Sequence, residues 1–395
     1  MIDRGRVPPP QVARDALVGP MLPGSNKTRH LFTARTGDVV LEHLRTVEGE
    51  AADMNEVSLM SDADVARAVP VPGVTLYGGV FTNHFGHMLA ETVHRLWAAA
   101  LLPEYADVAI AFQVGEGRTL PIEPWMLQIF AQFGIGPERL LFVNRPMRFE
   151  ELHVPRQGRV LGGVMPIEGY ADLFPVRPIA PEWPASPRLY VSRRQFGHRG
   201  TYLGESMIET ALQRDGYEVV YPETLPFEAV LRKLVGAREI VFCEGSAIHH
   251  LEVTGRIDAR VFVIGRRAGT RHRFSRLLEA TAREYTIFGK TRGTVCLEWD
   301  RMKEVPFQAR TCSFVDLPAL VRELSAFSGV AMGVPDEASI RRAESLDLLR
   351  YILDPRVGQE SNDEQIGRLL RMMREAPDVK RLLPRPRRSR GQATT

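Results

Sequence analysis

The stretch of sequence that decides the fold runs from Arg238 to Gly265 and reads REIVFCEGSAIHHLEVTGRIDARVFVIG. It contains two short apolar runs, Glu239–Cys243 and Arg260–Ile264, which are typical of buried strands. The segment Ser246–Thr254 between them predicts a helix. A strand, a helix and a second strand in this order predict a parallel pair, because parallel neighbours need a crossover connection. The stretch therefore indicates an α/β fold.

The same alternation continues on both sides of this stretch. Towards the N-terminus the expected elements are strands at Val74–Val80, Val108–Val114, Leu140–Val143, Glu151–Val154, Leu189–Ser192 and Glu218–Tyr221, with helices at His84–Leu102, Glu123–Phe133, Glu205–Arg214 and Phe227–Val235. Towards the C-terminus they are a helix at Phe274–Arg283, strands at Tyr285–Phe288 and Thr294–Trp299, and helices at Leu317–Phe327, Glu337–Ile352 and Asp363–Arg374. The chain is therefore expected to end in helices that pack on the α/β part.

Length and proline content predict the domain organisation. A chain of 395 residues is too long for one compact core, so two domains are expected. Five prolines between residues 175 and 187 interrupt regular structure, because proline lacks a backbone donor and restricts its predecessor. The predicted parts are an N-terminal extension (1–24), a first domain (25–175), a linker (176–187), a second domain (188–300), a helical region (301–378) and a basic tail (379–395).

Composition narrows the class of protein. With 44% hydrophobic and 25% charged residues and a net charge of +3, the chain is expected to fold in water. It shows no secretory signal and no window of about 18 apolar residues, so a cytoplasmic location is expected. The three cysteines predict reduced thiols rather than disulfides or a zinc module. The basic run Arg381–Arg390 is either a solvated tail or a peripheral contact with anionic lipid on the inner face of the membrane.

The first cluster of unusual side chains lies in NHFGHMLAETVHRLW, from Asn83 to Trp97. On a continuous helix His84, His87, Glu91 and His94 would project from one face. Three interpretations remain open: a general base oriented by the carboxylate, a metal site, and a network of buried polar groups. The metal site is disfavoured, because ligands from one helix cannot surround zinc tetrahedrally without partners from elsewhere. A base is favoured, because histidine titrates near neutral pH.

The second cluster is RLYVSRRQFGHRGTYLGE, from Arg188 to Glu205. Ser192, Arg193 and Arg199 follow a predicted strand, at the end of a parallel sheet where open α/β folds bind ligands. Arginine suits phosphate, so a diphosphate site is predicted. The alternative is a solvated turn between a strand and a helix.

The third cluster, VFCEGSAIHH, contains Glu244, Gly245, Ser246 and His249 at the end of a predicted strand. Ser246 is a good N-cap, and the N-terminus of the helix would offer N–H groups to a phosphate or a sugar hydroxyl. The alternative is an ordinary capped turn. The chain has no P-loop, no GxGxxG after a strand and no GxSxG, which argues against kinase-like, nicotinamide-dependent and hydrolase functions.

The three clusters together resemble a known family. HFGHMLAETVHRLW, LYVSRR with Arg199, and EGSAIHHL occur in the order seen in glycosyltransferase family 61, the bacterial capsular polysaccharide type. The resemblance covers roughly Tyr77 to Gly265. It implies a GT-B-like fold, in which two Rossmann-like domains face a cleft, and inverting transfer from a nucleotide-diphosphate sugar without a resident cofactor or an obligatory metal.

The resemblance also implies roles for individual residues. His84, His87 and Glu91 would form the catalytic, acceptor-side group. Ser192, Arg193 and Arg199 would contact the donor diphosphate, and Glu244, Gly245, Ser246 and His249 would close around the nucleotide and sugar. Many members carry an asparagine before the glutamate that begins the following helix, and this chain has Gly204 before Glu205.

The expected function is transfer of a sugar to a hydroxyl of a glycan or lipid-linked glycan in cell-surface or capsular polysaccharide synthesis. Two alternatives stay open: a nucleotide-sugar epimerase of similar architecture, and a non-catalytic protein that binds nucleotide sugars or polysaccharide. Nucleic acid is not an expected partner, because the basic residues gather in the tail and are not interleaved with aromatic ones. The sequence leaves the oligomeric state open.

Overall fold

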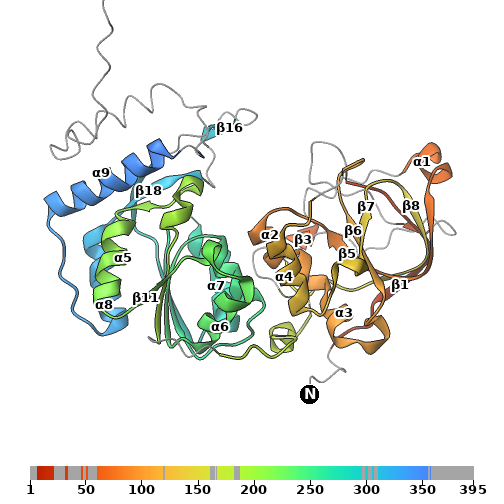
Figure 1. Ribbon diagram of the computed structural model, residues 1–395, viewed down its shortest axis with the longest axis horizontal. Coiled ribbons are helices and arrows are strands. Elements are labelled where there is room, and N and C mark those ends of the chain that lie inside the picture. The colour runs from red at the N-terminus through yellow and green to blue at the C-terminus, as the bar shows by residue number, and fades with distance from the viewer. Residues whose placement is uncertain are drawn as a thin grey trace, which may run out of the picture. The chain divides into compact units, whose positions relative to one another are not determined.

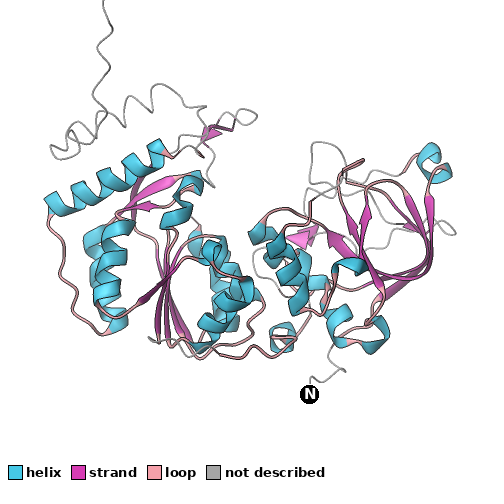
Figure 2. Ribbon diagram, viewed as in Figure 1, coloured by secondary structure: helices cyan, strands magenta, loops and turns pink. Residues whose placement is uncertain are grey.

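The computed structural model describes residues 7–21, 32–33, 46–47, 50–51, 60–118, 121–160, 165, 167–181, 187–267, 269–295, 299–300, 305–306, 310–354 and 356. Helices and strands alternate along much of this part of the chain, which confirms the α/β class (Figures 1 and 2). Contacts group the chain into two compact units, each made of several chain segments. Unit 1 comprises Met1–Val191, Pro222–Val263 and Gly269–Thr286, and unit 2 comprises Ser192–Tyr221, Ile264–Ala268 and Ile287–Thr395. The predicted linear domain boundaries stay predictions.

The first sheet of unit 1 has six strands in the order β2-β1-β8-β5-β6-β7. Their bounds are β1 Gln11–Val18, β2 Phe32–Thr33, β5 Val69–Val80, β6 Ala109–Gln113, β7 Leu140–Val143 and β8 Met147–Val154. β8, β5, β6 and β7 pair in parallel, whereas β1 pairs antiparallel with β8 and with β2. β1 lies in the stretch expected to be an N-terminal extension, so this strand was not predicted.

The main core of unit 1 is built from aromatic side chains. The ring of Phe81 packs edge-on against Phe112, with 5.7 Å between the centroids, and stacks on Phe130 at 6.2 Å. Trp97 is fully buried in the same cluster. Next to the ring of Phe112 only glycine fits at position 78, because a Cβ there would lie 2.3 Å from that ring. A smaller cluster around Tyr77, Phe149 and their neighbours forms a second core of the unit.

The predicted helix His84–Leu102 is wrong as one continuous element. The chain instead forms α2 (Phe85–Ala90), the 3₁₀ helix η3 (Thr92–Arg95) and α3 (Trp97–Leu101). The break falls at Glu91, whose φ of −136° and ψ of −61° are not helical. Side chains after the break bond to backbone elsewhere in the unit: Thr92 Oγ1 donates to the carbonyl of Val80 at 2.9 Å, and Trp97 Nε1 to that of Arg156 at 3.0 Å. These bonds anchor the segment that follows the break, while its backbone continues in a 3₁₀ turn in which the His94 N–H donates to the carbonyl of Glu91 at 3.2 Å.

The two strands of the stretch Arg238–Gly265 belong to a five-stranded sheet in the order β11-β9-β12-β13-β14. β9 (Arg188–Val191) pairs with β12 (Glu239–Cys243) in the predicted parallel direction. The remaining elements of this alternation are α5 Glu205–Arg214, β11 Glu218–Val220, α6 Phe227–Gly236, η9 Ser246–Glu252, β13 Arg260–Ile264, α7 Thr270–Thr281 and β14 Glu284–Phe288. The segment Ser246–Glu252 is a 3₁₀ helix rather than an α-helix.

Unit 2 contains a mixed three-stranded sheet that was not predicted, in the order β10-β18-β15. Its strands are β10 Tyr202–Leu203, β15 Thr291–Val295 and β18 Cys312–Val315. The helices α8 (Leu317–Ser328) and α9 (Glu337–Leu353) confirm the two predicted at these positions, and each begins after an aspartate that caps it. The predicted helix Asp363–Arg374 and the basic tail lie outside the described residues.

Short elements complete the described chain: β3 Thr46–Val47, β4 Glu50–Ala51, α1 Asp62–Ala66, η4 Pro103–Tyr105, α4 Pro124–Gln132, η5 Pro137–Arg139, η6 Tyr170–Leu173, η7 Arg194–Arg199, η8 Pro222–Thr224, β16 Trp299–Asp300 and β17 Val305–Pro306. Among the described helices, none has the length and apolar character that crossing a membrane requires.

Candidate active site

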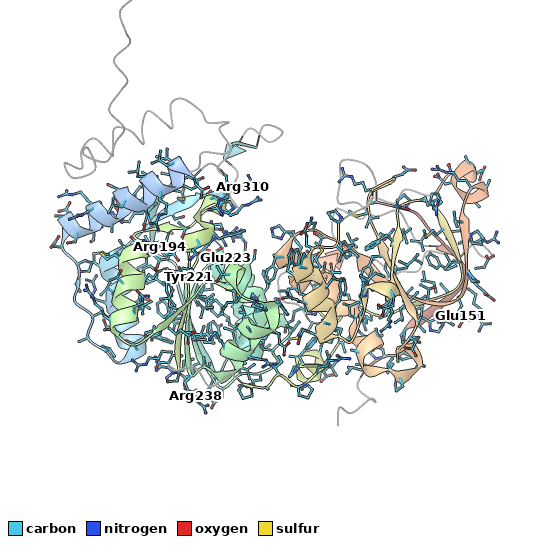
Figure 3. The ribbon with its side chains drawn as sticks, viewed as in Figure 1. Glu151, Arg194, Tyr221, Glu223, Arg238 and Arg310 are labelled. Atoms are coloured by element: carbon cyan, nitrogen blue, oxygen red, sulfur yellow. The ribbon has the colours of Figure 1, made fainter. Side chains whose placement is uncertain are left out.

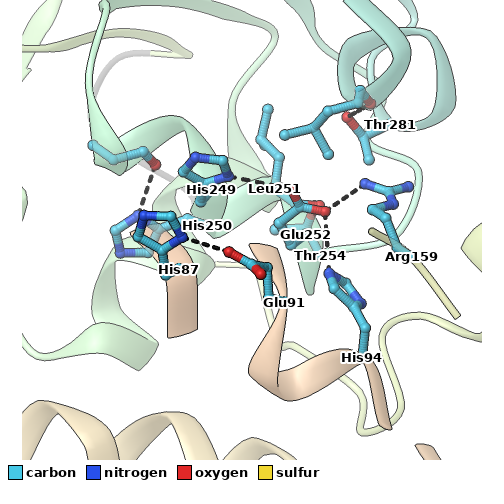
Figure 4. A network of polar contacts seen from close by, with 12 residues as sticks. His87, Glu91, His94, Arg159, His249, His250, Leu251, Glu252, Thr254 and Thr281 are labelled. Carbon is cyan, nitrogen blue, oxygen red and sulfur yellow. Dashed lines mark hydrogen bonds and ion pairs between the residues drawn. The ribbon is translucent and has the colours of Figure 1, made fainter. Parts of the chain in front are cut away.

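Within unit 1, the short helices α2 and η9 pack against each other, although more than 150 residues of chain separate them. Gly86 of α2 makes this contact close. A Cβ on Gly86 would lie 3.0 Å from Ser246 Oγ and 3.4 Å from His249 Cδ2. The first and third sequence clusters are therefore brought together in one place (Figure 4).

His84, His87 and Glu91 lie along α2 and just before it. His84 is exposed and caps the helix, since its Nδ1 accepts from the backbone N–H of His87 at 3.3 Å. The rings of His84 and His87 meet edge to face, with 4.8 Å between their centroids. His87 Nδ1 is hydrogen-bonded to Glu91 Oε1. The side chain of His87 is 42% exposed and that of Glu91 is 12% exposed, so the pair combines an open ring with a more enclosed carboxylate.

His94 does not share the face of His87, because the break at Glu91 turns it into the interior. Its side chain is completely buried, and its Nδ1 lies 3.2 Å from the hydroxyl of Tyr170. Its Nε2 lies 3.4 Å from Glu252 Oε2, without the geometry of a hydrogen bond. Burial lowers the pKa of His94, which opposes a charge on this ring. The interpretation as a buried polar network thus fits His94.

Glu252 is the centre of this buried network. Arg159 Nη1 lies 2.5 Å from its Oε2, and His249 Nδ1 lies 3.2 Å from its Oε1 (Figure 4). Desolvation would raise the pKa of Glu252, but the charge of Arg159, the hydrogen bond from His249 and the nearby ring of His94 hold it well below its usual range. Glu252 is therefore an ionised carboxylate inside unit 1, with Arg159 as its counter-ion.

The two neighbouring histidines of η9 have different surroundings. His249 keeps 15% of its side chain exposed, and its ring lies 5.5 Å from that of Phe274. His250 is buried, lies 2.8 Å through Nδ1 from the carbonyl of Ala247, and stacks on Phe227 at 4.9 Å. Burial lowers the pKa of His250 to about 4. His250 is thus a packed, neutral ring, and His249 is the accessible one.

The residues just before His249 depart from the predicted capped turn. Ser246 is the first residue of η9 and makes no capping bond through its side chain, so its prediction as the N-cap is wrong. Gly245 occupies the N-cap position with an extended backbone, φ 177°. Glu244 is fully buried, accepts from Thr270 Oγ1 at 2.7 Å and lies 3.9 Å from Arg273 Nη1. Glu244 therefore supports the turn from inside.

The second cluster forms a structured loop within unit 2. Arg193 donates through Nε to the carbonyl of Gly200 at 2.5 Å and through Nη2 to that of Arg199 at 3.0 Å. Ser192 is buried, and its hydroxyl lies 3.0 Å from Glu205 Oε1. The side chain of Arg199 is exposed. Ser192 and Arg193 thus shape the loop, and Arg199 is its outward cation.

The carboxylates of Glu205 and Glu209, both buried, support this loop from the interior of unit 2. Glu205 Oε1 accepts from the backbone N–H of Arg193 at 2.7 Å. Glu209 Oε1 accepts from Arg194 Nη1 and from the hydroxyl of Tyr221, both at 2.8 Å; Arg194 and Tyr221 are labelled in Figure 3. Burial, with the hydrogen bond to Glu209, raises the pKa of Tyr221 to about 12, so its hydroxyl stays a donor.

Gly204, the residue before Glu205, has a φ of +90°. This left-handed conformation is strained for most residues, and glycine and asparagine are those that adopt it most readily. The backbone at this position therefore suits the asparagine that the resemblance implies as well as the glycine present here. The Gly204 N–H also donates to Asp347 Oδ2 at 3.0 Å, which fixes the start of α5 to α9 inside unit 2.

Unit 1 therefore brings together six predicted site residues around α2 and η9: His84, His87, Glu91, Gly245, Ser246 and His249, with Glu244 buried behind them. Unit 2 holds Ser192, Arg193 and Arg199 on one loop. Glu252 and Arg159 were not predicted from the sequence as site residues. Glu252 follows His249 by three residues, a spacing that places side chains on the same side of a helix and is visible in the sequence.

Within the described ranges, no group of three or more histidine, cysteine, aspartate or glutamate side chains is arranged to hold a metal ion. His87 and Glu91 engage each other, and the carboxylate of Glu252 is engaged by Arg159. What this arrangement can do chemically is to accept a proton at an oriented, exposed imidazole.

Comparison with known proteins identifies the family. The model of the family described as Glycosyltransferase 61 matches residues 85–254. The match begins at the first residue of α2 and ends two residues beyond η9, so it includes His87, Glu91, Arg159, His249 and Glu252. No curated protein matches the chain.

Proposed function

Because the chain belongs to glycosyltransferase family 61 and is a glycosyltransferase, we propose that it moves a sugar from a nucleotide-diphosphate sugar to a hydroxyl of a glycan or lipid-linked glycan. The transfer inverts the anomeric carbon and serves cell-surface or capsular polysaccharide synthesis. The observation that carries the assignment of the site is the bond between His87 Nδ1 and Glu91 on the matched segment.

In this proposal His87 is the general base. An ionised Glu91 can only accept a hydrogen bond, so the ring carries its proton on Nδ1 and leaves Nε2 as the acceptor. No described residue hydrogen-bonds Nε2, and the ring is exposed enough to meet a substrate. Nε2 takes the proton of the acceptor hydroxyl, and the oxygen of that hydroxyl attacks the anomeric carbon of the donor sugar. At the same time the bond from the anomeric carbon to the diphosphate breaks. General-base catalysis of this kind contributes about 10²- to 10⁴-fold.

His84 stays beside the base rather than acting as one. Its Nδ1 already accepts from the backbone of His87, and this bond fixes the first turn of α2. The ring-to-ring contact then limits the orientations that His87 can adopt. Of the two histidines predicted as alternatives, the proposal therefore takes His87 as the base and His84 as the supporting cap.

The negative charge on the departing nucleotide diphosphate needs cationic or N–H partners. Arg199 is the preferred contact, because its side chain is exposed while the guanidinium of Arg193 is bonded to loop carbonyls. Ser192 and Arg193 act by holding that loop. Ser246 and His249 lie beside α2 and contact the sugar or nucleotide, with Glu244 and Gly245 shaping the turn. No resident cofactor or metal is required, because these groups supply the charge stabilisation.

A GT-B-like arrangement would put the donor and the acceptor on two Rossmann-like domains that face a cleft. The enzyme would work at the cytoplasmic face of the membrane, where the basic segment Arg381–Arg390 meets anionic lipid and brings it to a lipid-linked acceptor.

The test is turnover by the purified full-length protein with UDP-, GDP-, CMP- and dTDP-sugars, with and without a panel of glycan acceptors. The expected result is nucleotide release that depends on the acceptor, together with an acceptor that gains the mass of one sugar. Conversion of the donor to an isomeric nucleotide sugar without acceptor would instead identify an epimerase. Binding of a nucleotide sugar without turnover in any combination would identify a binding protein.

A further inference from the structure

A second histidine and carboxylate pair lies next to the proposed base. His249 Nδ1 is 3.2 Å from Glu252 Oε1, and Glu252 Oε2 is 2.5 Å from Arg159 Nη1 (Figure 4). Glu252 and Arg159 each expose only 4% of their side chains, whereas His249 exposes 15%. The pair therefore has a buried half that is fixed by an ion pair and an accessible half that is the imidazole.

The charge state of Glu252 determines which nitrogen of His249 carries a proton. A carboxylate without a proton can only accept hydrogen bonds. The pKa of Glu252 lies well below its usual range, mainly because Arg159 offsets the desolvation of the carboxylate. His249 must therefore donate from Nδ1, and the neutral ring keeps a lone pair on Nε2.

The edge of the ring that carries Nε2 faces α2. Cδ2, the carbon bonded to Nε2, lies 3.4 Å from the position that a Cβ would occupy on Gly86, the residue directly before His87. No described residue hydrogen-bonds His249 Nε2. The lone pair on Nε2 is thus left for a group that enters beside α2.

We infer that Glu252, paired with Arg159, fixes His249 in the tautomer protonated on Nδ1, so that His249 Nε2 accepts a hydrogen bond from a hydroxyl group of the bound nucleotide sugar. Glu252 and Arg159 are positioning residues, since both act through His249. The inference rests on the proposed function for the identity of the ligand, but the tautomer is a property of the protein without ligand.

The tautomer is measured on the full-length protein with ¹⁵N-labelled histidine, by long-range ¹H–¹⁵N correlation of the rings, with H249Q to assign the signals. The expected result is a protonated Nδ1 and an unprotonated Nε2 for His249. A wild-type spectrum with the proton on Nε2 would overturn the inference.

Glu252→Gln is the variant that tests the cause. Arg159 would hold the oxygen of the substituted amide, so the amide NH₂ would face His249 Nδ1 and favour protonation of Nε2 instead. The tautomer of His249 is therefore expected to invert, while the signals of His87 and His250, which have other partners, stay in place. If E252Q does not fold, the double variant R159M/E252Q removes both charges and is expected to give a mixture of tautomers. An unchanged His249 in the variant measured would contradict the role of Glu252.

The ligand is tested with the nucleotide sugar that gives the largest thermal stabilisation in a screen of UDP-, GDP-, CMP- and dTDP-sugars. Its addition should shift the Nε2 signal of His249 in the wild type, and E252Q should bind it roughly tenfold more weakly, the effect of one hydrogen bond. Equal affinities and an unmoved Nε2 signal would refute the contact with the ligand. If none of the nucleotide sugars binds, the proposed function fails, whereas the tautomer result still decides the positioning role.

Discussion

Replacement of Arg159 by methionine tests the buried ion pair between Arg159 and Glu252. The guanidinium and Glu252 are both almost completely buried and lie 2.5 Å apart. Methionine has a similar length and no charge, so Arg159→Met leaves the carboxylate of Glu252 without its counter-ion in the interior. Breaking a buried pair in this way costs about 3–5 kcal/mol of unfolding free energy. The bond from Arg159 Nη2 to Met165 Sδ at 3.4 Å adds little to this cost.

The double variant R159M/E252Q is the matched control. It removes the ion pair as a whole, and replacing both charges of a buried pair is often close to neutral. The double variant is therefore expected to be more stable than R159M alone. Urea unfolding at pH 7.5, followed by tryptophan fluorescence and far-UV circular dichroism, gives the midpoints. An R159M midpoint equal to that of the wild type, or a double variant less stable than both single variants, would refute the reasoning.

The same pair predicts how stability depends on pH. The folded pKa of Glu252 lies below its unfolded value near 4.5, so its contribution is fully present above the unfolded value and is lost as pH falls through the folded one. Without Arg159 the burial of Glu252 raises its folded pKa instead, and the penalty applies only where the carboxylate is ionised. The stability difference between the wild type and R159M should therefore be smaller at pH 4 than at pH 7.5. A difference that grows towards acid pH would contradict the assigned charge state.

Three further substitutions test other parts of the account. Glu91→Gln should lower kcat about 10- to 100-fold with little change in KM, because the carboxylate orients the base; an equal change in both constants would point to substrate binding instead. Gly86→Ala should lower turnover about tenfold, because the methyl group would lie 3.0 Å from Ser246 Oγ and 3.4 Å from His249 Cδ2 and would displace η9 from α2; unaltered turnover would count against the contact. Gly204→Ala should lower the free energy of unfolding by about 1–2 kcal/mol because of the φ of +90°, and by a further ~1–3 kcal/mol because the new methyl group would lie 2.6 Å from a buried leucine methyl group of α8. The control Gly216→Ala, at φ +81° with open space around it, should show only the first loss. Equal losses in the two variants would show that the contact with α8 does not matter.

The alternation of strands and helices from Arg188 onwards was predictable because each strand is a short apolar run next to an amphipathic helix. β12 and β13 occupy the bounds expected from the sequence, and β9 ends one residue early. β1 was not predictable in this way, since it carries Arg14 and Asp15 and its partner β8 lies more than 120 residues later. A strand that depends on so distant a partner leaves only a weak local signal.

The pairing of His87 with Glu91 was predictable, because residues four apart meet on one turn of a helix. The turn survives at this point, since the Glu91 N–H still donates to the carbonyl of His87 at 2.9 Å. The break that follows was not predictable, because the side chains after it bond to carbonyls outside the helix, as those of Thr92 and Trp97 do, and the sequence does not show these contacts. Because of that break, His94 does not lie on the same face as His87, and its ring lies next to Glu252.

Arg159 gave no signal in the sequence. It lies in an irregular segment after β8, and only the fold carries its guanidinium to Glu252. Glu252 itself carried a detectable signal in its spacing from His249, but that spacing says nothing of burial or of the counter-ion. The sequence therefore identified the proposed site residues on α2 and η9 better than the buried groups that hold them.

The most direct test of the central claim is the rate of sugar transfer by His87→Gln, compared with the wild type and with His153→Gln. His153 is a partly buried histidine bonded to Tyr105 and Glu151 on the six-stranded sheet of unit 1, and no step of the proposed reaction uses it. With the donor and acceptor identified by turnover, H87Q should lose about 10²- to 10⁴-fold in kcat at an unchanged KM for the donor, and H153Q should keep the wild-type rate. A kcat for H87Q within a few-fold of the wild type would show that His87 is not the base.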